Sequence, residues 1–153
     1  MIKGLYEAHL PVRDLKRSIE FYTSLELELA YETPKLAFFW IVKGQSWVGL
    51  WETDRAKTPY HPSLRHIAFH VDVEAIRNAM DWLAEREIEG RTAFGFSPEE
   101  QPPLILPNHP FAHAAVYFHD PDGNSLEFIA PLDLEVEDEF DMMSLAQWDQ
   151  KHV

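Results

Sequence analysis

The stretch RHIAFHVDVEAIRNAM, residues 65–80, begins with the alternation of a β-strand and continues with the spacing of an amphipathic helix. Alternate residues from Ile67 to Val71 are apolar and share one face, whereas His66 and His70 lie on the opposite face. A strand with apolar residues on one side rarely presents imidazoles to a second apolar layer. The histidine-bearing face is therefore the first candidate for a functional surface.

The same plan occurs earlier in the chain. AHLPVRDLKRSIEFY, residues 8–22, is also a short strand followed by an amphipathic helix. His9 corresponds to His66, and Asp14 corresponds to Asp72 with one residue inserted. Both aspartates are predicted to be N-caps of the helices that follow them. The chain therefore contains an internal repeat of supersecondary size.

Three strand-like runs follow each helix, and Gly90 is predicted to end the second helix. The first set is LELAYET (27–33), KLAFFWIVK (35–43) and SWVGLWE (46–52). The second set is RTAFGFS (91–97), HAAVYFH (113–119) and NSLEFIA (124–130), the last two joined by the turn DPDG (120–123). These elements predict an α+β fold of two tandem βαβββ modules, at about 3–54 and 63–131, in a single domain spanning 1–153.

The segment after the second module, residues 132–153, begins with LDLEVEDEFD, which carries six acids and no base. We interpret this segment as a solvated acidic C-terminal tail. Within it FDMMSLAQWDQK, residues 140–151, is predicted to form a short helix that packs through residues such as Trp148.

Composition excludes several classes of function. The formal net charge of −13 argues against nucleic acid and anionic membranes as partners, because both require a basic surface. The longest apolar run, LAFFWIV at 36–42, is too short to cross a bilayer, and the N-terminus lacks a signal-peptide pattern, so we expect a cytoplasmic protein. The chain has no cysteine, which excludes disulfides and zinc–sulfur sites. Any metal must be bound through nitrogen and oxygen.

Three polar residues are predicted to point away from the helix-packed face of their strands. They are His9, His66 and Glu127, the last of which is flanked by two apolar residues. Two imidazoles and a carboxylate form the facial set that binds a divalent first-row metal with open positions for substrate. Taken singly, each histidine could be a hydrogen-bonded structural residue, and Glu127 could pair with an arginine such as Arg65. Their equivalent strand positions in two repeated units favour a shared metal site.

The sequence resembles the vicinal oxygen chelate superfamily, which includes glyoxalase I, fosfomycin-resistance enzymes, bleomycin-binding proteins and extradiol dioxygenases. The resemblance covers roughly residues 5–131 and rests on AHLPVRDLKRSIEFY, RHIAFHV and YFHDPDGNSLEFIA. It implies paired modules whose mixed sheet curls around a metal cavity, with His9, His66 and Glu127 as ligands of one divalent metal per chain. The metal it implies is Fe(II) or Mn(II), with Zn(II) or Ni(II) as alternatives. It also implies a homodimer, in which strands from both chains sometimes complete each site.

Within the superfamily, the second half of the chain is most similar to one-domain extradiol dioxygenases, which cleave catechol rings. HPFAHAAVYFHDPDGNSLE, residues 109–127, has their order of a histidine, a hydrophobic-Tyr pair, an Asp-Pro-x-Gly turn and the ligand glutamate. This resemblance implies that His109 or His113 shuttles a proton and that Tyr117 hydrogen-bonds the bound oxygen. Pro107, two residues before the first histidine, departs from the signature.

Two alternatives remain open. A lyase or transferase of the glyoxalase or fosfomycin-resistance type is the first. Resemblance to glyoxalase I requires a fourth-ligand glutamate on the last strand of the first module, and the equivalent position here is about Leu50, which favours three ligands; Glu52 follows two residues later on the same face and would reach the metal only if the register shifted. Fosfomycin enzymes place cationic side chains near the end of the second module, where this chain has PLDLEVEDEFD (131–141). The second alternative is a non-catalytic small-molecule-binding protein of the same fold, although bleomycin-binding proteins lack the metal ligands.

The aromatic content of 13% favours an aromatic or apolar small-molecule substrate. His70 lies roughly 7 Å along the strand from His66, too far to replace it as a ligand, and could either orient a ligand or lie at the cavity rim. The aromatic residues that could line the cavity or belong to the core are Phe38, Phe39, Trp40, Trp47, Trp51, Phe94, Phe96 and Phe111.

Overall fold

The computed structural model describes residues 3–56, 64–91, 102–106, 111–135 and 141–152. They group into two units, which we describe separately. Unit 1 comprises Met1–Ile67 and Asp120–Ser125, and unit 2 comprises Ala68–His119 and Leu126–Val153. The turn predicted at 120–123 therefore belongs to the same unit as the first module, although it joins two strands of the second.

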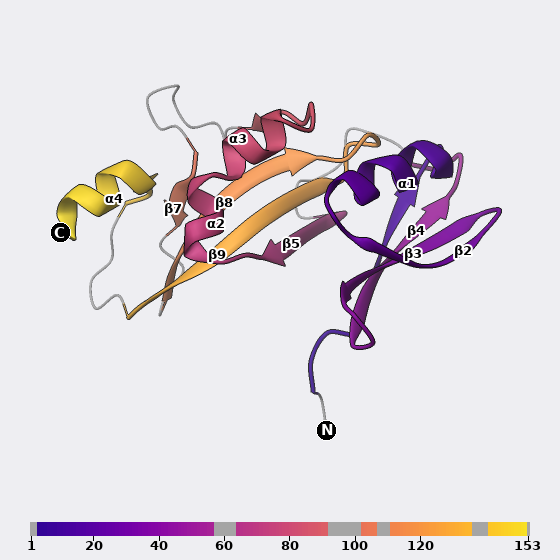
Figure 1. Cartoon of the computed structure of the whole chain (residues 1–153), viewed down its shortest axis with the longest axis horizontal. Coiled ribbons are helices and arrows are strands. Elements are labelled where there is room, and N and C mark those ends of the chain that lie inside the picture. Colours follow the sequence, from indigo (N-terminus) through magenta and orange to yellow (C-terminus); the bar gives the residue numbers. More distant parts are fainter. Residues whose placement is uncertain (1–2, 57–63, 92–101, 107–110, 136–140, 153) are drawn as a thin grey trace. The chain divides into compact units, whose positions relative to one another are not determined.

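In the described part of unit 1, a helix packs on a four-stranded sheet (Figure 1). β1 runs parallel to β4, whereas β3 is antiparallel to both β4 and β2, so the strand order is β1-β4-β3-β2. The strands and the helix predicted for the first module are confirmed. Their bounds are β1 (Glu7–Val12), α1 (Leu15–Ser24), β2 (Glu28–Thr33), β3 (Leu36–Val42) and β4 (Ser46–Glu52).

Helix α1 begins at the predicted position because two carboxylates satisfy its first amide groups. Asp14 Oδ1 accepts a hydrogen bond from Arg17 N at 3.0 Å, which confirms Asp14 as the N-cap. Glu52 Oε2, from the end of β4, accepts a second hydrogen bond from Leu15 N at 3.1 Å. The helix start is therefore fixed to the sheet as well as to its own N-cap.

One face of the unit 1 sheet packs against α1 and the other carries His9. Leu10 and Val12 are buried at 2% and 0% exposure, in agreement with the period-two pattern of β1. Tyr22 of α1 is also fully buried, and its ring centroid lies 5.9 Å from that of Phe39 on β3. The predicted parity of His9 is confirmed, because its side chain lies on the face opposite this core.

Unit 2 is built on a sheet with six described strands, in the order β10-β7-β8-β9-β5, with β6 also paired to β8. The ring of Phe128 packs between those of Phe118, at 4.8 Å, and Trp82, at 5.7 Å. The first residues of β5 and β9 belong to unit 1. The bounds are β5 (His66–His70), α2 (Val73–Arg77), α3 (Ala79–Ala84), β6 (Gly90–Arg91), β7 (Leu104–Leu106), β8 (Phe111–His119), β9 (Ser125–Glu135), β10 (Met143–Ser144) and α4 (Leu145–Lys151).

The second module differs from its prediction at the helix. The single amphipathic helix is divided at Asn78, where φ is −101° and ψ is 3°. Asp72 is the N-cap residue of α2 but makes no side-chain cap hydrogen bond. The helical stretch ends at Ala84, so the prediction that Gly90 ends it is wrong. Gly90 instead packs against Met80, since an added Cβ would lie 2.6 Å from the end of the Met80 side chain, which would have to move.

Two further elements were placed differently by the sequence. β7 lies in a proline-rich stretch that gave no strand signal, and the strand predicted at 91–97 lies outside the described residues apart from Arg91. The C-terminal helix predicted within 140–151 is confirmed but begins at Leu145, because Ser144 and Gln147 form a capping box there. The α+β class is confirmed. None of the described helices is both long and apolar enough to cross a bilayer.

Candidate metal centre

His9 lies near the middle of β1, on the sheet face opposite α1. Its Nε2 is 3.2 Å from Oε1 of Glu7, and the indole Nε1–H of Trp51 donates a hydrogen bond to its Nδ1. Because a neutral imidazole carries one N–H, the bond from Trp51 places the lone pair on Nδ1 and the proton on Nε2, facing Glu7. Both ring nitrogens of His9 therefore have protein partners in this structure. The bond from the Trp47 indole is the main cause of the lowered pKa of the Glu7 carboxyl, and His9 adds to it.

A glycine on β4 makes room for the His9 ring. The strand register pairs Gly49 with His9 on one side and with Phe38 on the other. A Cβ added at Gly49 would lie 2.6 Å from Nδ1 of His9 and 2.8 Å from Cε1 of Phe38. A Cβ carbon does not approach a non-bonded heavy atom this closely, so both rings can occupy their present positions only because residue 49 has no side chain.

His66, the first residue of β5, is held by the adjacent strand. Its Nδ1 lies 3.1 Å from the carbonyl oxygen of Ser125 and 3.1 Å from the hydroxyl of the same residue. A carbonyl oxygen can only accept, so this bond requires the proton on Nδ1 and leaves the lone pair on Nε2. Metal-binding histidines commonly have this arrangement, since the carbonyl fixes both the tautomer and the ring orientation.

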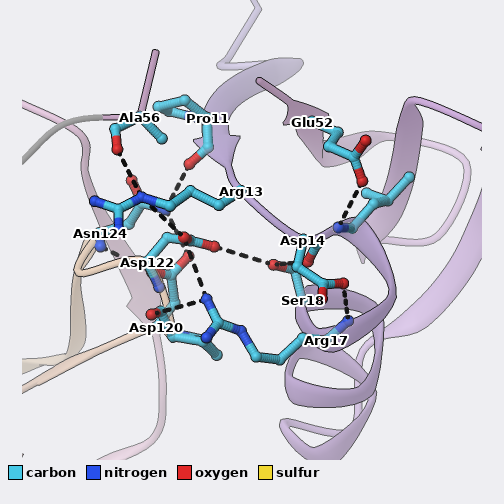
Figure 2. Close-up of polar contacts among 12 residues, drawn as sticks. Pro11, Arg13, Asp14, Arg17, Ser18, Glu52, Ala56, Asp120, Asp122 and Asn124 are labelled. Carbon is cyan, nitrogen blue, oxygen red and sulfur yellow. Dashed lines mark hydrogen bonds and ion pairs between the residues drawn. The ribbon is translucent and has the colours of Figure 1, made fainter. Parts of the chain in front are cut away.

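A buried polar network fixes the turn that precedes β9 (Figure 2). Asp120 Oδ1 accepts hydrogen bonds from the backbone N of Asp122 at 2.9 Å and of Asn124 at 2.8 Å. Arg17 Nη2 lies 3.2 Å from Oδ1 of Asp122, and the Tyr22 hydroxyl donates to Oδ2 of Asp120 at 3.1 Å. Burial raises the pKa of Asp120 and raises that of Tyr22 well above its ordinary value.

The same turn anchors both histidine-bearing strands. Asn124 Nδ2 donates to the carbonyl oxygen of Pro11, two residues after His9, at 3.1 Å. Arg65, the residue before His66, donates from Nε to Oδ1 of Asn124 at 2.6 Å. These bonds lie within unit 1, so the turn fixes the positions of β1 and of the start of β5 together.

In unit 2, Glu127 shares a face with two of the residues predicted to be catalytic. Its side chain is buried, Nε2 of His113 lies 4.0 Å from its Oε1, and the Tyr117 hydroxyl hydrogen-bonds it. Burial, together with the charge of Glu127, raises the pKa of Tyr117 above its usual range. Burial lowers the pKa of His113. At neutral pH the group therefore holds a protonated phenol and a neutral imidazole beside a carboxyl group.

Arg91 brings a cation to this face. It lies on β6 opposite Tyr117 in the register of β8, and its guanidinium carbon is 5.5 Å from the centroid of the Tyr117 ring. The positive charge of Arg91 partly offsets the rise in the Tyr117 pKa. The described face thus combines a guanidinium with a phenol, an imidazole and a carboxyl group.

The structure brings the predicted residues together in two groups. His9 and His66 belong to unit 1, whereas Glu127 and its two neighbours belong to unit 2. Across the described ranges there is no cluster of three or more His, Asp or Glu side chains placed to hold a metal. The three-ligand site therefore stays a prediction. His109 lies outside the described residues, and His70 is exposed at the end of β5.

A family model described as the Glyoxalase/Bleomycin resistance protein/Dioxygenase superfamily matches residues 4–128. The chain belongs to this family. Metallothiol transferase FosB of Staphylococcus epidermidis is 29% identical to it over 121 residues, which cover 76% of this chain and 73% of FosB.

Several solved structures are similar over most of the chain. Integron cassette protein HFX_CASS4, from the mobile metagenome of the Halifax Harbour Sewage Outfall, has a TM-score of 0.64 and 26% identity, over 84% of this chain and 99% of its own. Fosfomycin resistance protein FosX of Listeria monocytogenes, complexed with Mn(II) and sulfate, has a TM-score of 0.61 and 24% identity, over 87% and 94%. This last likeness concerns the fold. The relatives with named activities do not favour the extradiol interpretation.

The sequence put the fourth-ligand position of glyoxalase I at about Leu50, with Glu52 as the nearest carboxylate. Leu50 is fully buried on the α1 side of β4. Glu52 lies on that same side, where it forms an ion pair with Lys35 and accepts the hydrogen bond from Leu15 at the start of α1. Its carboxylate serves the helix N-terminus and does not share the face of His9.

The hydrogen-bond ladders show which residues of the two modules correspond. In the first module the backbone amide of Trp47 donates to the carbonyl oxygen of Tyr6 at 2.9 Å. In the second module the backbone amide of Ser125 donates to the carbonyl oxygen of Arg65 at 3.0 Å. In the first module this bond places Trp47 opposite the residue that follows Tyr6. The same geometry places Ser125 opposite His66.

The first module then gives the position equivalent to Glu127. His9 is opposite Gly49, so Gly49 corresponds to Ser125. Two residues further along each strand, Trp51 corresponds to Glu127. In this member of the glyoxalase family an indole therefore stands at the position of the first module that a carboxyl group occupies in the second.

The sequence did not reveal the polar contacts of Trp51, Ser125 and Arg91. Trp51 was counted only among the aromatic residues. The alternation of β4, once that strand is paired with β1, could have indicated that Trp51 and His9 lie on the same face and meet. Ser125 follows the Asp-Pro-Asp-Gly turn and contacts His66 through its backbone as well as its side chain, which composition does not show. The contact of Arg91 with Tyr117 depends on the pairing of β6 with β8, and no sequence motif predicts that pairing.

Proposed function

We propose that the protein is a divalent-metal-dependent transferase or lyase acting on a small molecule, with His9, His66 and Glu127 as the metal ligands. Membership of the glyoxalase family and the similarity to a metallothiol transferase support this proposal. The observation that carries it is the orientation of His66. Its Nδ1–H bond to the carbonyl of Ser125 leaves the lone pair on Nε2, and a metal requires a nitrogen with a lone pair.

The donor set fits a first-row divalent metal. Two imidazoles and one carboxylate, without sulfur, suit Mn(II) or Fe(II), and also accept Zn(II) or Ni(II). His9 fits less directly, because its two nitrogens are engaged by Trp51 and Glu7 and one of these contacts must be exchanged. When bound, the metal would lower the pKa of a coordinated substrate oxygen and polarise the substrate.

His113 and Tyr117 are proposed to carry the proton chemistry beside Glu127. Burial lowers the pKa of His113, so its imidazole is neutral at pH 7 and can accept a proton from the substrate or the nucleophile. Burial keeps Tyr117 protonated, so its hydroxyl can donate a hydrogen bond to a substrate oxygen that gains charge. Arg91, over the Tyr117 ring, adds a positive charge that favours the build-up of negative charge on the same substrate oxygen.

The substrate is proposed to have an aromatic or apolar skeleton. The imidazole of His9 lies 5.7 Å from the ring of Phe38 and 5.8 Å from that of Trp51. By register, the strand residues of β1 to β4 that share this face include no lysine or arginine. A multiply charged anion would be poorly accommodated there, whereas a neutral ring would pack on the aromatic side chains.

A ring-cleaving dioxygenase is the second candidate, and one observation favours it. His113 and Tyr117 lie beside Glu127, in agreement with the roles that the extradiol resemblance implies for them. In this case the metal would be Fe(II). We also propose a homodimer, which size measurement by light scattering would test directly.

The test combines metal content with a substrate panel. Protein loaded anaerobically with Mn(II) or Fe(II) should contain about one equivalent per chain, as expected for one triad. Turnover of a thiol with an epoxide, or of a glutathione hemithioacetal, supports the transferase or lyase. A yellow ring-fission product from a catechol, with oxygen uptake, replaces it with the second candidate. Metal far below one equivalent contradicts both.

A further inference from the structure

Trp51 occupies in the first module the strand position that Glu127 occupies in the second. Its indole N–H donates to Nδ1 of His9, and the two rings are 5.8 Å apart with an interplanar angle of 43°. The Trp51 side chain is not part of the α1-facing core, since 47% of the residue is exposed. Its contact with His9 can therefore be exchanged without disturbing buried packing.

This hydrogen bond is incompatible with a metal on His9. A metal bound at Nδ1 takes the lone pair that the indole N–H uses. A metal bound at Nε2 displaces the proton from that atom to Nδ1, which then meets the indole as a second donor. Whichever nitrogen of His9 binds the metal, the indole N–H of Trp51 must leave it.

The departure leaves a donor that needs a new acceptor. An indole has one N–H and no accepting nitrogen, so Trp51 cannot itself act as a fourth metal ligand. Trp51 is partly exposed, so water can accept this N–H while no substrate is bound. On the face around His9 the Glu7 carboxylate already contacts Trp47 and His9, and Phe38 offers only a ring, so an oxygen of a bound substrate would be an additional acceptor for the indole.

We propose that Trp51 holds His9 while the metal is absent and donates its N–H to an oxygen of the metal-bound substrate once the metal is present. This inference rests on the proposed function, with His9 as a metal ligand. Trp51 thus acts on two equilibria in opposite directions: it competes with the metal for His9, and it strengthens binding of the chelating substrate.

The chain provides a matched control in Trp47. Its side chain lies on the same face of β4, four residues before Trp51, and its indole N–H donates to Oε2 of Glu7 at 2.7 Å. Trp47 therefore makes the same kind of hydrogen bond without touching a ring nitrogen of His9. Trp47→Phe removes an indole N–H just as Trp51→Phe does, but it releases no competitor of the metal.

The test measures binding of Mn(II), and then of catechol to the Mn(II)-loaded protein, by calorimetry. Trp51→Phe should bind Mn(II) about 2- to 10-fold more tightly than wild type, because one net hydrogen bond no longer competes. The same variant should bind catechol about 2- to 10-fold more weakly. Trp47→Phe should not bind Mn(II) more tightly. General damage to the fold would weaken both ligands, so the opposite signs identify the proposed role.

A second readout follows the indole itself. The Nε1–H signal of Trp51, assigned by its loss in Trp51→Phe, should shift in the nitrogen–proton spectrum when Zn(II) is added. If wild type binds metal but the variant binds it equally or more weakly, or if this signal does not move, the inference about Trp51 is wrong and the proposed function stands. If neither protein binds metal, the proposed function fails, and the role of Trp51 with it.

Discussion

The two units present their predicted ligands in contrasting surroundings. In unit 1, His9 lies on an aromatic sheet face, and its contacts are with the exposed side chains of Glu7 and Trp51. In unit 2, Glu127 is only 5% exposed and lies beside buried His113 and Tyr117. One supersecondary plan therefore produces an accessible histidine in one unit and a buried acid in the other.

The difference shows that the repeat determines the backbone but not the chemistry of the equivalent positions. Gly49 and Ser125 occupy equivalent strand positions in the two modules. Gly49 leaves space for the ring of His9, whereas Ser125 fixes the tautomer of His66. Trp51 and Glu127 also match, and one supplies a hydrogen-bond donor where the other supplies a carboxylate. Divergence at these positions gives the first module an aromatic sheet face and the second a buried carboxyl group.

The largest effect is expected from His66→Ala. Loss of a ligand nitrogen should abolish tight binding of Mn(II), and it should lower the melting temperature only when metal is present, because only then does ligand linkage stabilise the wild type. His70→Ala is the control, since His70 lies exposed on the same strand, and it should keep affinity within about twofold. Calorimetric titration of both variants checks this. Loss of metal in His70→Ala with retention in His66→Ala would contradict the ligand assignment.

The second-largest effect is expected at Gly49 of unit 1 and tests whether this glycine positions His9. Gly49→Ala places a Cβ against the rings of His9 and Phe38, which must move. Displacement of a ligand from its orientation should weaken Mn(II) binding by roughly 10–100-fold. Gly44→Ala is a suitable control, because Gly44 has nothing within 4 Å and a φ of +73°, so it should reduce stability without reducing metal affinity. Equal metal affinity in wild type and Gly49→Ala would exclude this positioning role.

A third comparison sets Tyr22 of unit 1 against Tyr117 of unit 2. Burial raises the pKa of both hydroxyls in the folded state, and Tyr22 is the more completely buried of the two residues. Because the unfolded-state value is about 10, this contribution to stability is complete below that pH and is lost as the pH rises beyond it. Tyr22→Phe should cost about 1–3 kcal/mol at pH 7, through the lost bond to Asp120, and should flatten the alkaline decline.

Urea unfolding between pH 7 and 11 measures this effect. Tyr117→Phe should flatten the decline less than Tyr22→Phe. The reverse order would mean that the hydroxyl of unit 2 is the more strongly buried group in solution.

The smallest effects concern two ion pairs. Arg17 contacts Asp122, whose side chain is 1% exposed, whereas Arg77 contacts Asp149, whose side chain is 41% exposed. Arg17→Ala should destabilise by about 1–2 kcal/mol because it removes a partner of a buried carboxylate. Arg77→Ala should change stability by about 0.2–1 kcal/mol, and less at high salt. Unfolding of both variants at two salt concentrations would reveal whether the buried partner makes the difference.

Much of the fold follows from sequence period and caps. The alternation in β1 placed His9 opposite Leu10, and Asp14 fixed the start of α1, because both depend on neighbouring residues alone. The break at Asn78 was missed, since the amphipathic pattern continues through it. The role of Gly90 was also missed, because its packing against Met80 depends on tertiary structure.

The site was predictable only in part, for the same physical reason. Strand parity gave the faces of His9 and His66, but it could not give the bond to Ser125, which joins strands distant in the sequence. The sequence also put the fourth-ligand position at Leu50, one residue from Trp51. The register of β4 against β1 depends on how the two strands pair, and the sequence of one strand alone does not determine it.

The turn at 120–124 has a consequence for how the chain folds. Tyr22 meets Asp120 across 98 residues, and Asn124 meets Pro11 across 113. Contacts of such high sequence separation slow folding, because a long loop must close before they form. On the ribosome, the first module emerges complete in sequence but must wait for most of the remaining chain before Tyr22 and Arg17 find their partners. A fragment that ends after the first module would lack those partners permanently, so it should be less stable than the same residues in the full chain.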